Sequence, residues 1–378
     1  MELNVSRKLT LSPIDIDAMT AFIKRIQKMN GEIPWSLDGK TDPWDHVESA
    51  MGLSMAGCRT EAERAYLWLV ENQQEDGSWC AAYRDGRAED RTRDTNMSTY
   101  IAVGTFHHYL MTEDLNFLRE IWPALKAGID FAVQMQANSG EIYWAKNEAG
   151  VVDPMALLTG CSSIYMSLKC GLAVARLLGK KKPAWERALA KLGHAIRQRP
   201  NLFNMIKSRF SMDWYYPVLC GAITGAAAIK RMEKQWEKFV VPEWGVRCVS
   251  DRPWVTMAET SELVLALEAI GDYTQAELVF SWLQDKKFDD GSYWMGVTFP
   301  DRVIWPEEKT TWTAAAVLIA YDALMDLTPA AGLFRHDFWE RSGYLPADLL
   351  RDLPAAFPSP LPAGMYKVDA RVSLSETR

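Results

Sequence analysis

The sequence predicts an all-α protein, an (α/α)6 barrel (α/α toroid) of about six helical hairpins. Two observations predict it. A segment that ends in tryptophan recurs along the 378 residues, and apolar and amphipathic helical segments alternate between its copies. The period-two alternation that marks a half-buried strand is nearly absent.

The recurring segment is an apolar helix followed by glutamine, an acidic or amide residue with glycine, and an aromatic run ending in tryptophan. Four clear copies occupy residues 21–35, 65–79, 128–144 and 278–294, and two weaker copies end at Trp214 and Trp254. Glycine takes the left-handed conformation without steric cost, so we expect it to end the helix. The tryptophan would pack the turn against its neighbour.

A second kind of helix follows each turn and is apolar on nearly all sides, as expected of a buried inner helix. Six such stretches occur, at 46–57, 96–110, 160–179, 215–229, 259–271 and 310–324. The helices before the turns are more amphipathic, which is typical of an outer ring. We therefore divide the chain into an extension (1–20), the toroid (21–328) and a Pro-rich tail (329–378), with its last dozen residues disordered.

Composition excludes several classes of function. The net charge is -7 and the pI is about 5.4, which argues against nucleic acid or an anionic membrane as partner. No apolar stretch is long enough for a signal peptide or a spanning helix, so we expect a cytoplasmic protein. The six cysteines form no CxxC pair and the five histidines no HxxxH pair, so we expect neither a metal nor another cofactor.

The starts of the inner helices carry the candidate site, because these starts converge at one mouth of such a barrel. Five of the six supply a carboxylate, which either caps its helix or serves a functional mouth. Glycoside cleavage needs one carboxyl to protonate the leaving oxygen and another to activate water or attack. Glu259 and Glu308 are the preferred pair, with Asp94 and Asp213 next.

Candidate substrate-binding residues surround these acids. They are Asp45, His46, Glu48, Arg84, Arg93, Trp214, Tyr215, Trp254 and Trp312. Tryptophan faces stack on sugar rings or stabilise cations, although the turn tryptophans also serve the fold. His46 is either an oriented acid or base or a capped turn residue.

The QxxDGxW pattern, as in QQEDGSW (73–79), resembles the QW repeat of squalene and hopene cyclases and of protein prenyltransferase subunits. This resemblance implies the toroid fold. The DxDD motif of bacterial cyclases is missing, and VSDRPWVTMAET (249–260) is a degenerate match to the VSDCTAE-like segment of eukaryotic-type cyclases. Asp251 is the catalytic acid that this match implies. The zinc ligands of prenyltransferases are not recognisable.

A second stretch, RDTNMSTYIAVGTFHHYLMTEDLNFLREIWPALKAGIDFAVQMQ (93–136), is similar to six-hairpin glycosidases of the glucoamylase and trehalase type. It aligns Arg93, Asp94 and the helix start at 112–114. The favoured function is therefore a carbohydrate-active enzyme with acid and base carboxylates in a Trp-lined funnel. The alternatives are a terpenoid cyclase or prenyltransferase-like enzyme acting on an isoprenoid, and a non-catalytic binding or scaffold barrel.

Overall fold

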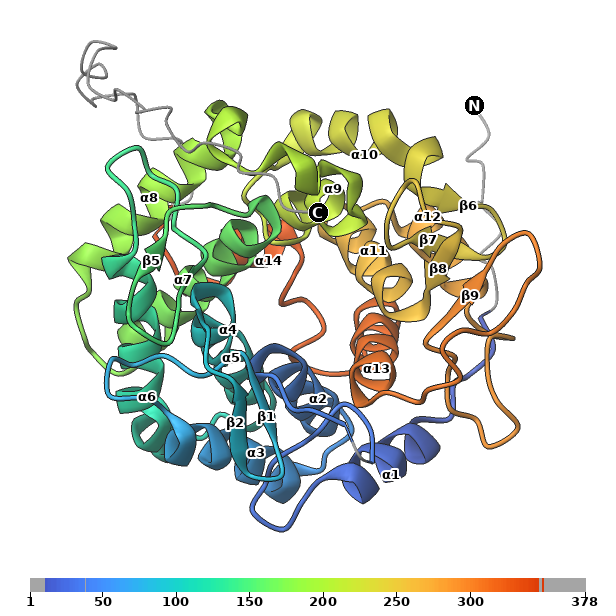
Figure 1. Ribbon diagram of the computed structural model, residues 1–378, viewed down its shortest axis with the longest axis horizontal. Helices are drawn as coiled ribbons and strands as arrows, with labels where there is room; N and C mark the ends of the chain where they lie inside the picture. The colour runs from blue at the N-terminus through green and yellow to red at the C-terminus, as the bar shows by residue number, and fades with distance from the viewer. Residues whose placement is uncertain (1–10, 38, 347–348, 350–378) are drawn as a thin grey trace, which may run out of the picture.

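Six inner helices form a closed ring in the computed structural model, which describes residues 11–37, 39–346 and 349. Each packs on the next around the ring and the last returns to the first (Figure 1). They are α2 (Pro43–Met55), α5 (Ile101–Thr112), α7 (Leu158–Leu177), α9 (Ser211–Leu219), α11 (Met257–Ala269) and α13 (Thr311–Met325). The short helix α4 (Thr95–Thr99) directly precedes α5. The predicted all-α toroid is confirmed.

Six further helices surround this ring. They are α1 (Ile16–Ile26), α3 (Arg59–Asn72), α6 (Leu115–Gln134), α8 (Pro183–Gln198), α10 (Gly225–Phe239) and α12 (Tyr273–Ser281). The two rings differ in burial, because every residue of α11 is buried whereas α10 buries only Ala228, Met232 and Phe239. This is the contrast between inner and outer helices that the sequence predicts.

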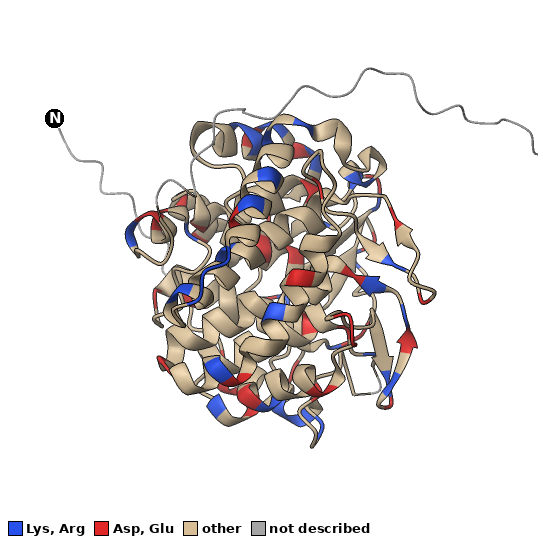
Figure 2. Ribbon diagram, turned by 90° about the vertical axis from the view of Figure 1, so that its left-hand side faces the viewer, with Lys and Arg blue, Asp and Glu red and all other residues tan. Residues whose placement is uncertain are grey.

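The loops that lead from outer to inner helices carry small antiparallel sheets, which the sequence analysis did not predict. The strands are β1 (Ala82–Arg84), β2 (Arg87–Asp90), β3 (Arg93–Asp94), β4 (Ala145–Lys146), β5 (Val152–Asp153), β6 (Val240–Val241), β7 (Gly245–Arg247), β8 (Trp254–Thr256) and β9 (Gly296–Thr298). They gather at the end of the barrel where the inner helices begin, which we call the mouth (Figure 2). Strands of two to four residues lack the length for a visible alternation.

The repeated glutamine explains why the turns recur. Gln73 Nε2 donates to the carbonyl of Gly77 (2.8 Å) in its own turn and to that of Ala124 (2.9 Å) on the next outer helix. Gln27 and Gln136 make the equivalent pairs of bonds. Gly77 has φ +90° and a Cβ there would meet the Ala127 oxygen at 2.4 Å. The helices end before these glycines. The glycine allows the left-handed conformation of the turn, and the glutamine hydrogen-bonds the turn to the next outer helix.

The other end of the barrel is filled by residues that follow α13. Phe334 is buried and lines the lower part of the central cavity. Arg335 pairs with Glu268 (3.1 Å) and α14 (His336–Arg341) buries Trp339 beneath the ring. The short 3-10 helices η1 (Pro200–Leu202) and η2 (Met205–Arg209) lie in the loop before α9. Within the described residues, no helix is long and apolar enough to cross a membrane.

Candidate active site

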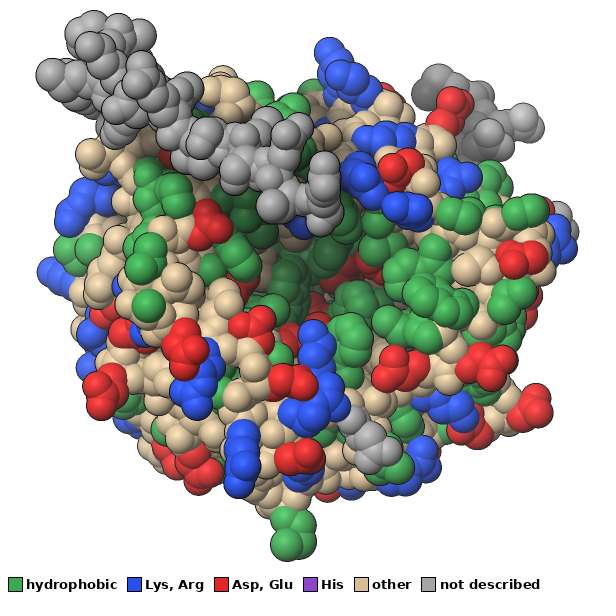
Figure 3. Space-filling model, viewed as in Figure 1, with side chains coloured by type: hydrophobic (Ala, Val, Ile, Leu, Met, Phe, Trp, Pro, Cys, Tyr) green, Lys and Arg blue, Asp and Glu red, His purple; other side chains and the backbone are tan. Residues whose placement is uncertain are grey.

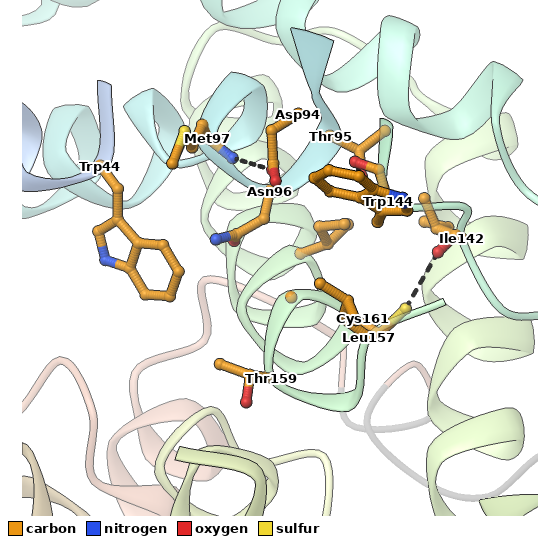
Figure 4. Close-up of a pocket in the computed structure, with 12 residues that line it drawn as sticks. Trp44, Asp94, Thr95, Asn96, Met97, Ile142, Trp144, Leu157, Thr159 and Cys161 are labelled. Carbon is orange, nitrogen blue, oxygen red and sulfur yellow. Dashed lines mark hydrogen bonds between the residues drawn. The ribbon is translucent and has the colours of Figure 1, made fainter. Parts of the chain in front are cut away.

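The mouth opens into a central hollow whose walls are largely hydrophobic and whose floor and edge carry acidic side chains (Figure 3). One pocket lies between the starts of α4 and α7, with Trp44 and Trp144 on opposite sides and Asn96 between them (Figure 4). A second, deeper cavity is lined by Glu48, Glu262 and apolar residues. Substrate groups therefore meet both apolar faces and carboxyl groups.

Three acids, Asp42, Asp45 and Glu48, follow one another at intervals of three residues at the start of α2. Asp42 caps the helix and accepts a hydrogen bond from the Asp45 backbone nitrogen (3.0 Å). Burial raises the pKa of Asp45 well above its ordinary value, and the charges of Asp42 and Glu48 raise it further. These effects favour the protonated form of the Asp45 carboxyl group.

Glu48 and Glu262 lie deeper in the funnel on α2 and α11. Glu48 accepts hydrogen bonds from Trp44 Nε1 (2.8 Å) and the Tyr100 hydroxyl (2.9 Å). Burial raises the pKa of Glu48 to about 7 and raises that of Glu262 well above its usual range.

Glu262 is bonded in a similar way. It accepts a hydrogen bond from the Tyr216 hydroxyl (2.6 Å) and another from Tyr215. Both carboxylates of the deeper pair are therefore oriented by aromatic donors.

Glu259 lies at the start of α11 and is 4% exposed. Its Oε2 atom has no hydrogen-bond partner among the described residues. Burial raises the pKa of Glu259 to about 7, an effect that the nearby Cys248 thiol partly offsets. A buried carboxylate oxygen without a partner is costly unless a ligand or water satisfies it. Glu259 therefore has the free acceptor that a general base or nucleophile needs.

Asp94 caps α4 by accepting a hydrogen bond from the Met97 backbone nitrogen (3.0 Å), and it lines the upper pocket (Figure 4). Burial raises its pKa to about 6, and the charge of Asp42 contributes. The Oδ1 atom of the neighbouring Asn96 is buried and has no hydrogen-bond partner within the part of the chain that the structure describes. Asp94 thus combines a capping role with a place in the pocket.

Two of the predicted residues lie at the junction of α13 and the loop before α2. Trp312 stacks on Trp35, with ring centroids 6.5 Å apart and planes 8° apart. Glu308, half of the preferred pair, accepts a hydrogen bond from Ser36 Oγ (2.8 Å). Unlike Glu259, Glu308 is only partly buried and already has a protein partner.

Three predicted residues are buried and bind neighbouring parts of the barrel. His46 is fully buried between the Ile33 nitrogen (3.1 Å) and the Ala65 oxygen (2.8 Å), and burial lowers its pKa to about 4. Asp213 accepts two hydrogen bonds from Thr159 (2.6 and 3.1 Å). Trp214 is 1% exposed and stacks on Phe239 at 5.4 Å. The structure places these residues in packing positions, and His46 is neutral.

Four more predicted residues lie on the rim. Arg84 pairs with Glu89 (2.8 Å) on the β1–β2 hairpin, and Arg93 pairs with Asp76 (3.0 Å). Asp251 is 57% exposed beside Arg209. Trp254 Nε1 donates to the Trp305 carbonyl (2.7 Å). These four residues line neither the upper pocket nor the deeper cavity.

Five residues of the funnel were missed by the sequence analysis: Trp44, Asp42, Tyr100, Tyr216 and Glu262. A usable signal existed for the acids, since Asp42, Asp45 and Glu48 follow one another at i+3, as do Glu259 and Glu262. Side chains three residues apart lie on one face of a helix. Among the described residues, no group of three histidines, cysteines or acids could hold a metal ion.

Comparison with solved structures gives the same fold. A wild-type glycosidase superposes with a TM-score of 0.62 at 15% identity, covering 84% of this chain and 96% of its own. The GH63 mannosylglycerate hydrolase from Thermus thermophilus superposes with a TM-score of 0.63 at 12% identity, covering 81% and 99%. D-mannose isomerase superposes with a TM-score of 0.60 at 11% identity, covering 82% and 96%. These likenesses agree with the resemblance to six-hairpin glycosidases.

A closer relationship comes from sequence, although no family model matches the chain. The MMP endo-(1,4)-3-O-methyl-alpha-D-mannosidase of Mycolicibacterium hassiacum is 48% identical over 325 residues, which cover 86% of this chain and 90% of that protein. The relation to a mannosidase makes this chain a glycoside hydrolase-like enzyme with a carbohydrate substrate. The chain belongs to the family of the MMP endo-(1,4)-3-O-methyl-alpha-D-mannosidase.

Proposed function

We propose that this enzyme cleaves internal (1,4) linkages in chains of 3-O-methyl-α-D-mannose. The observation that carries the proposal is the 48% identity to a relative named for that reaction, over nearly the whole of both chains. Two carboxyl groups of the funnel support it. Asp45 has a raised pKa, as a proton donor needs, and Glu259 has an oxygen without a hydrogen-bond partner among the described residues, as a base or nucleophile needs. The relatives reported above give no support to the isoprenoid alternative.

In the proposed mechanism Asp45 is the general acid. Burial and the neighbouring charges of Asp42 and Glu48 raise the pKa of Asp45, which favours a carboxyl group that can give a proton to the leaving glycosidic oxygen. Glu259 is the partner carboxylate, and its free Oε2 either takes a proton from the attacking water or bonds to the anomeric carbon. Glu48 and Glu262, oriented by tryptophan and tyrosine donors, bind sugar hydroxyls below the cleaved bond.

The mixed lining of the funnel suits a methylated sugar. A 3-O-methyl group replaces a hydroxyl donor with apolar surface, and burying apolar surface is favourable by roughly 25 cal/mol per Å². Trp44, Trp144 and Leu157 supply apolar faces in the upper pocket, next to the acids. An ordinary mannose chain would leave its 3-hydroxyl groups without partners against these faces.

The test is to incubate the purified protein with a (1,4)-linked oligomer of 3-O-methyl-α-mannose and to follow the products by mass spectrometry. We expect shorter oligomers with new reducing ends, no products with Glu259→Gln, and weaker cleavage of an unmethylated oligomer of equal length. If the methylated oligomer stays intact with the wild-type protein, the proposed substrate is wrong. If no glycan of a broad panel is bound or cleaved, the scaffold alternative replaces it.

A further inference from the structure

Exposed apolar side chains gather on the loops around the mouth. Large hydrophobic residues that lie in these outer-to-inner loops and are at least 37% exposed include Leu37, Val151, Val152, Met205, Ile206, Val303 and Trp305. Leaving such side chains in water gives the fold nothing, and their concentration beside a binding site marks a recognition surface. Trp305 offers the largest flat face among them, with 55% of its surface exposed.

Trp305 is held in place although it is exposed. Its carbonyl accepts a hydrogen bond from Trp254 Nε1 (2.7 Å), and the two rings meet edge to face with centroids 5.4 Å apart. Its backbone nitrogen donates to the Gly296 carbonyl (2.9 Å). A Cβ at Gly296 would lie 2.4 Å from Trp254 Nε1, so the glycine is needed for Trp254 to lie flat on β9. An exposed ring that is fixed in advance loses little freedom on binding.

This platform adjoins the funnel. Trp305 lies three residues before Glu308 in the segment that precedes α13, and Glu308 accepts a hydrogen bond from Ser36 on the neighbouring loop before α2. Figure 3 shows hydrophobic side chains over β8 and β9 that continue into the apolar wall of the hollow. Strand β8 carries Trp254, which packs against Trp305, and leads directly into α11, whose first turn carries Glu259. A glycan that extends from Glu259 along β8 therefore reaches the Trp305 ring.

We propose that Trp305, positioned by Trp254 and flanked by Val303, is a distal glycan subsite that stacks on a 3-O-methyl-mannose residue several units away from the cleaved bond. The inference rests on the proposed function. An enzyme that cuts inside a chain has sugar on both sides of the cut, so the chain continues beyond the funnel. Sugar rings pack against tryptophan faces, and methyl ethers add apolar contact that the flanking valine also meets.

The test compares Trp305→Ala, Trp305→Phe and wild type on methylated oligomers of increasing length. Tyr273→Ala is the matched control, because Tyr273 is 49% exposed at the start of an outer helix, at the opposite end of the barrel. For long oligomers we expect Trp305→Ala to raise KM about three- to tenfold with kcat unchanged. For the shortest cleaved oligomer we expect no change, and Trp305→Phe should recover most of the loss.

Equal KM values for wild type and Trp305→Ala at every length would overturn the subsite, and so would an equal loss at every length. A binding measurement separates this from failure of the proposed function. In the Glu259→Gln background, calorimetry with a long methylated oligomer should show affinity reduced by the further change Trp305→Ala and unaffected by Tyr273→Ala. If wild type cleaves the oligomer but these affinities are equal, only the subsite is wrong; if it neither binds nor cleaves, the proposed function fails.

Discussion

The starts of α2 and α9 both carry buried aspartates, but their surroundings differ. At α9, both bonds that Asp213 accepts come from one residue, Thr159, and Arg231 donates to its backbone carbonyl. At α2, Asp42 and Asp45 face each other and the carboxylate of Glu48, so that burial and like charge both oppose ionisation. The first arrangement joins two helices. The second places like charges side by side at the mouth, which raises the pKa of Asp45.

The comparison teaches that an acid at an inner-helix start is not in itself a sign of catalysis. The proposed catalytic acids differ from Asp213 in two ways: Glu259 Oε2 has no hydrogen-bond partner among the described residues, and burial with like charge raises the pKa of Asp45. Substitutions at the two kinds of position should therefore have opposite consequences for activity and for stability.

The largest expected effect is that of Glu259→Gln. The amide cannot accept a proton or attack carbon, so we expect kcat to fall about 10²- to 10⁴-fold. The melting temperature should stay the same or rise, because a costly buried charge is removed. Steady-state kinetics and calorimetric melting check both statements, and retention of more than a tenth of the activity would contradict the role of Glu259.

Asp45→Asn should also lower kcat by about 10²-fold or more, because the amide cannot donate the proton that the leaving oxygen needs. Stability should be unchanged or higher than in wild type, since the repulsion among the α2 acids is relieved. Activity on a substrate with a leaving group that needs no protonation should be largely retained. Equal losses on both substrates would argue for a structural role instead.

Asp213→Ala should show the opposite behaviour. It leaves the backbone nitrogen and hydroxyl of Thr159 without their acceptor, at a cost of about 1–3 kcal/mol in the free energy of unfolding. Activity below the melting transition should remain near that of wild type. Denaturant unfolding and kinetics at 25 °C measure the two effects, and an inactive but stable protein would move Asp213 into the catalytic set.

The pH dependence of stability sharpens the comparison. Glu48 and Glu259 have pKa values of about 7 in the folded protein against an ordinary value of 4.5. The folded state keeps protons that the unfolded chain releases. The contribution of Glu48 and Glu259 to the free energy of unfolding is therefore complete below about pH 4.5 and is lost as the pH rises through 7.

We expect the free energy of unfolding to fall by at least about 1 kcal/mol between pH 5 and 8. Urea titrations at several pH values measure this slope. Glu48→Gln should reduce the slope, whereas a slope that is unchanged in this variant would mean that Glu48 is ionised throughout.

The smallest effect is expected for Arg84→Ala. Arg84 pairs with Glu89 at a solvent-exposed site, where water and salt screen the ion pair. Neither KM nor the melting temperature should change measurably. A rise in KM above threefold would show that the β1–β2 hairpin contacts substrate.

Much of the fold was predictable because the repeat is a local pattern. The glutamine, glycine and tryptophan of each turn lie within one short segment, and the inner helices can be recognised in the sequence from their apolar residues. The candidate site was only partly predictable, because funnel position depends on helix rotation and on contacts between distant segments. Glu259 Oε2 has no hydrogen-bond partner among the described residues, whereas Glu308 accepts a hydrogen bond from Ser36, a residue 272 positions away.

The same limit explains the residues that were missed. Trp44 and Tyr100 belong to different hairpins and meet only when the ring closes, with their centroids 5.4 Å apart. The short strands were not predicted because they pair across loops of unequal length and show no alternation of apolar and polar residues in the sequence. Asp42 precedes a proline at the start of a helix, and by sequence alone it is an ordinary capping residue.

Phe334 and α14 fill the lower end of the barrel, and this affects how the enzyme can bind and cleave a long polymer. A barrel filled at its lower end cannot be threaded, so both arms of a bound glycan must leave by the side through which they entered. If the proposed function holds, we expect the enzyme to release the glycan after each cut instead of sliding along it. Early digests of a long polymer should therefore contain fragments of many sizes rather than a ladder of one repeating product.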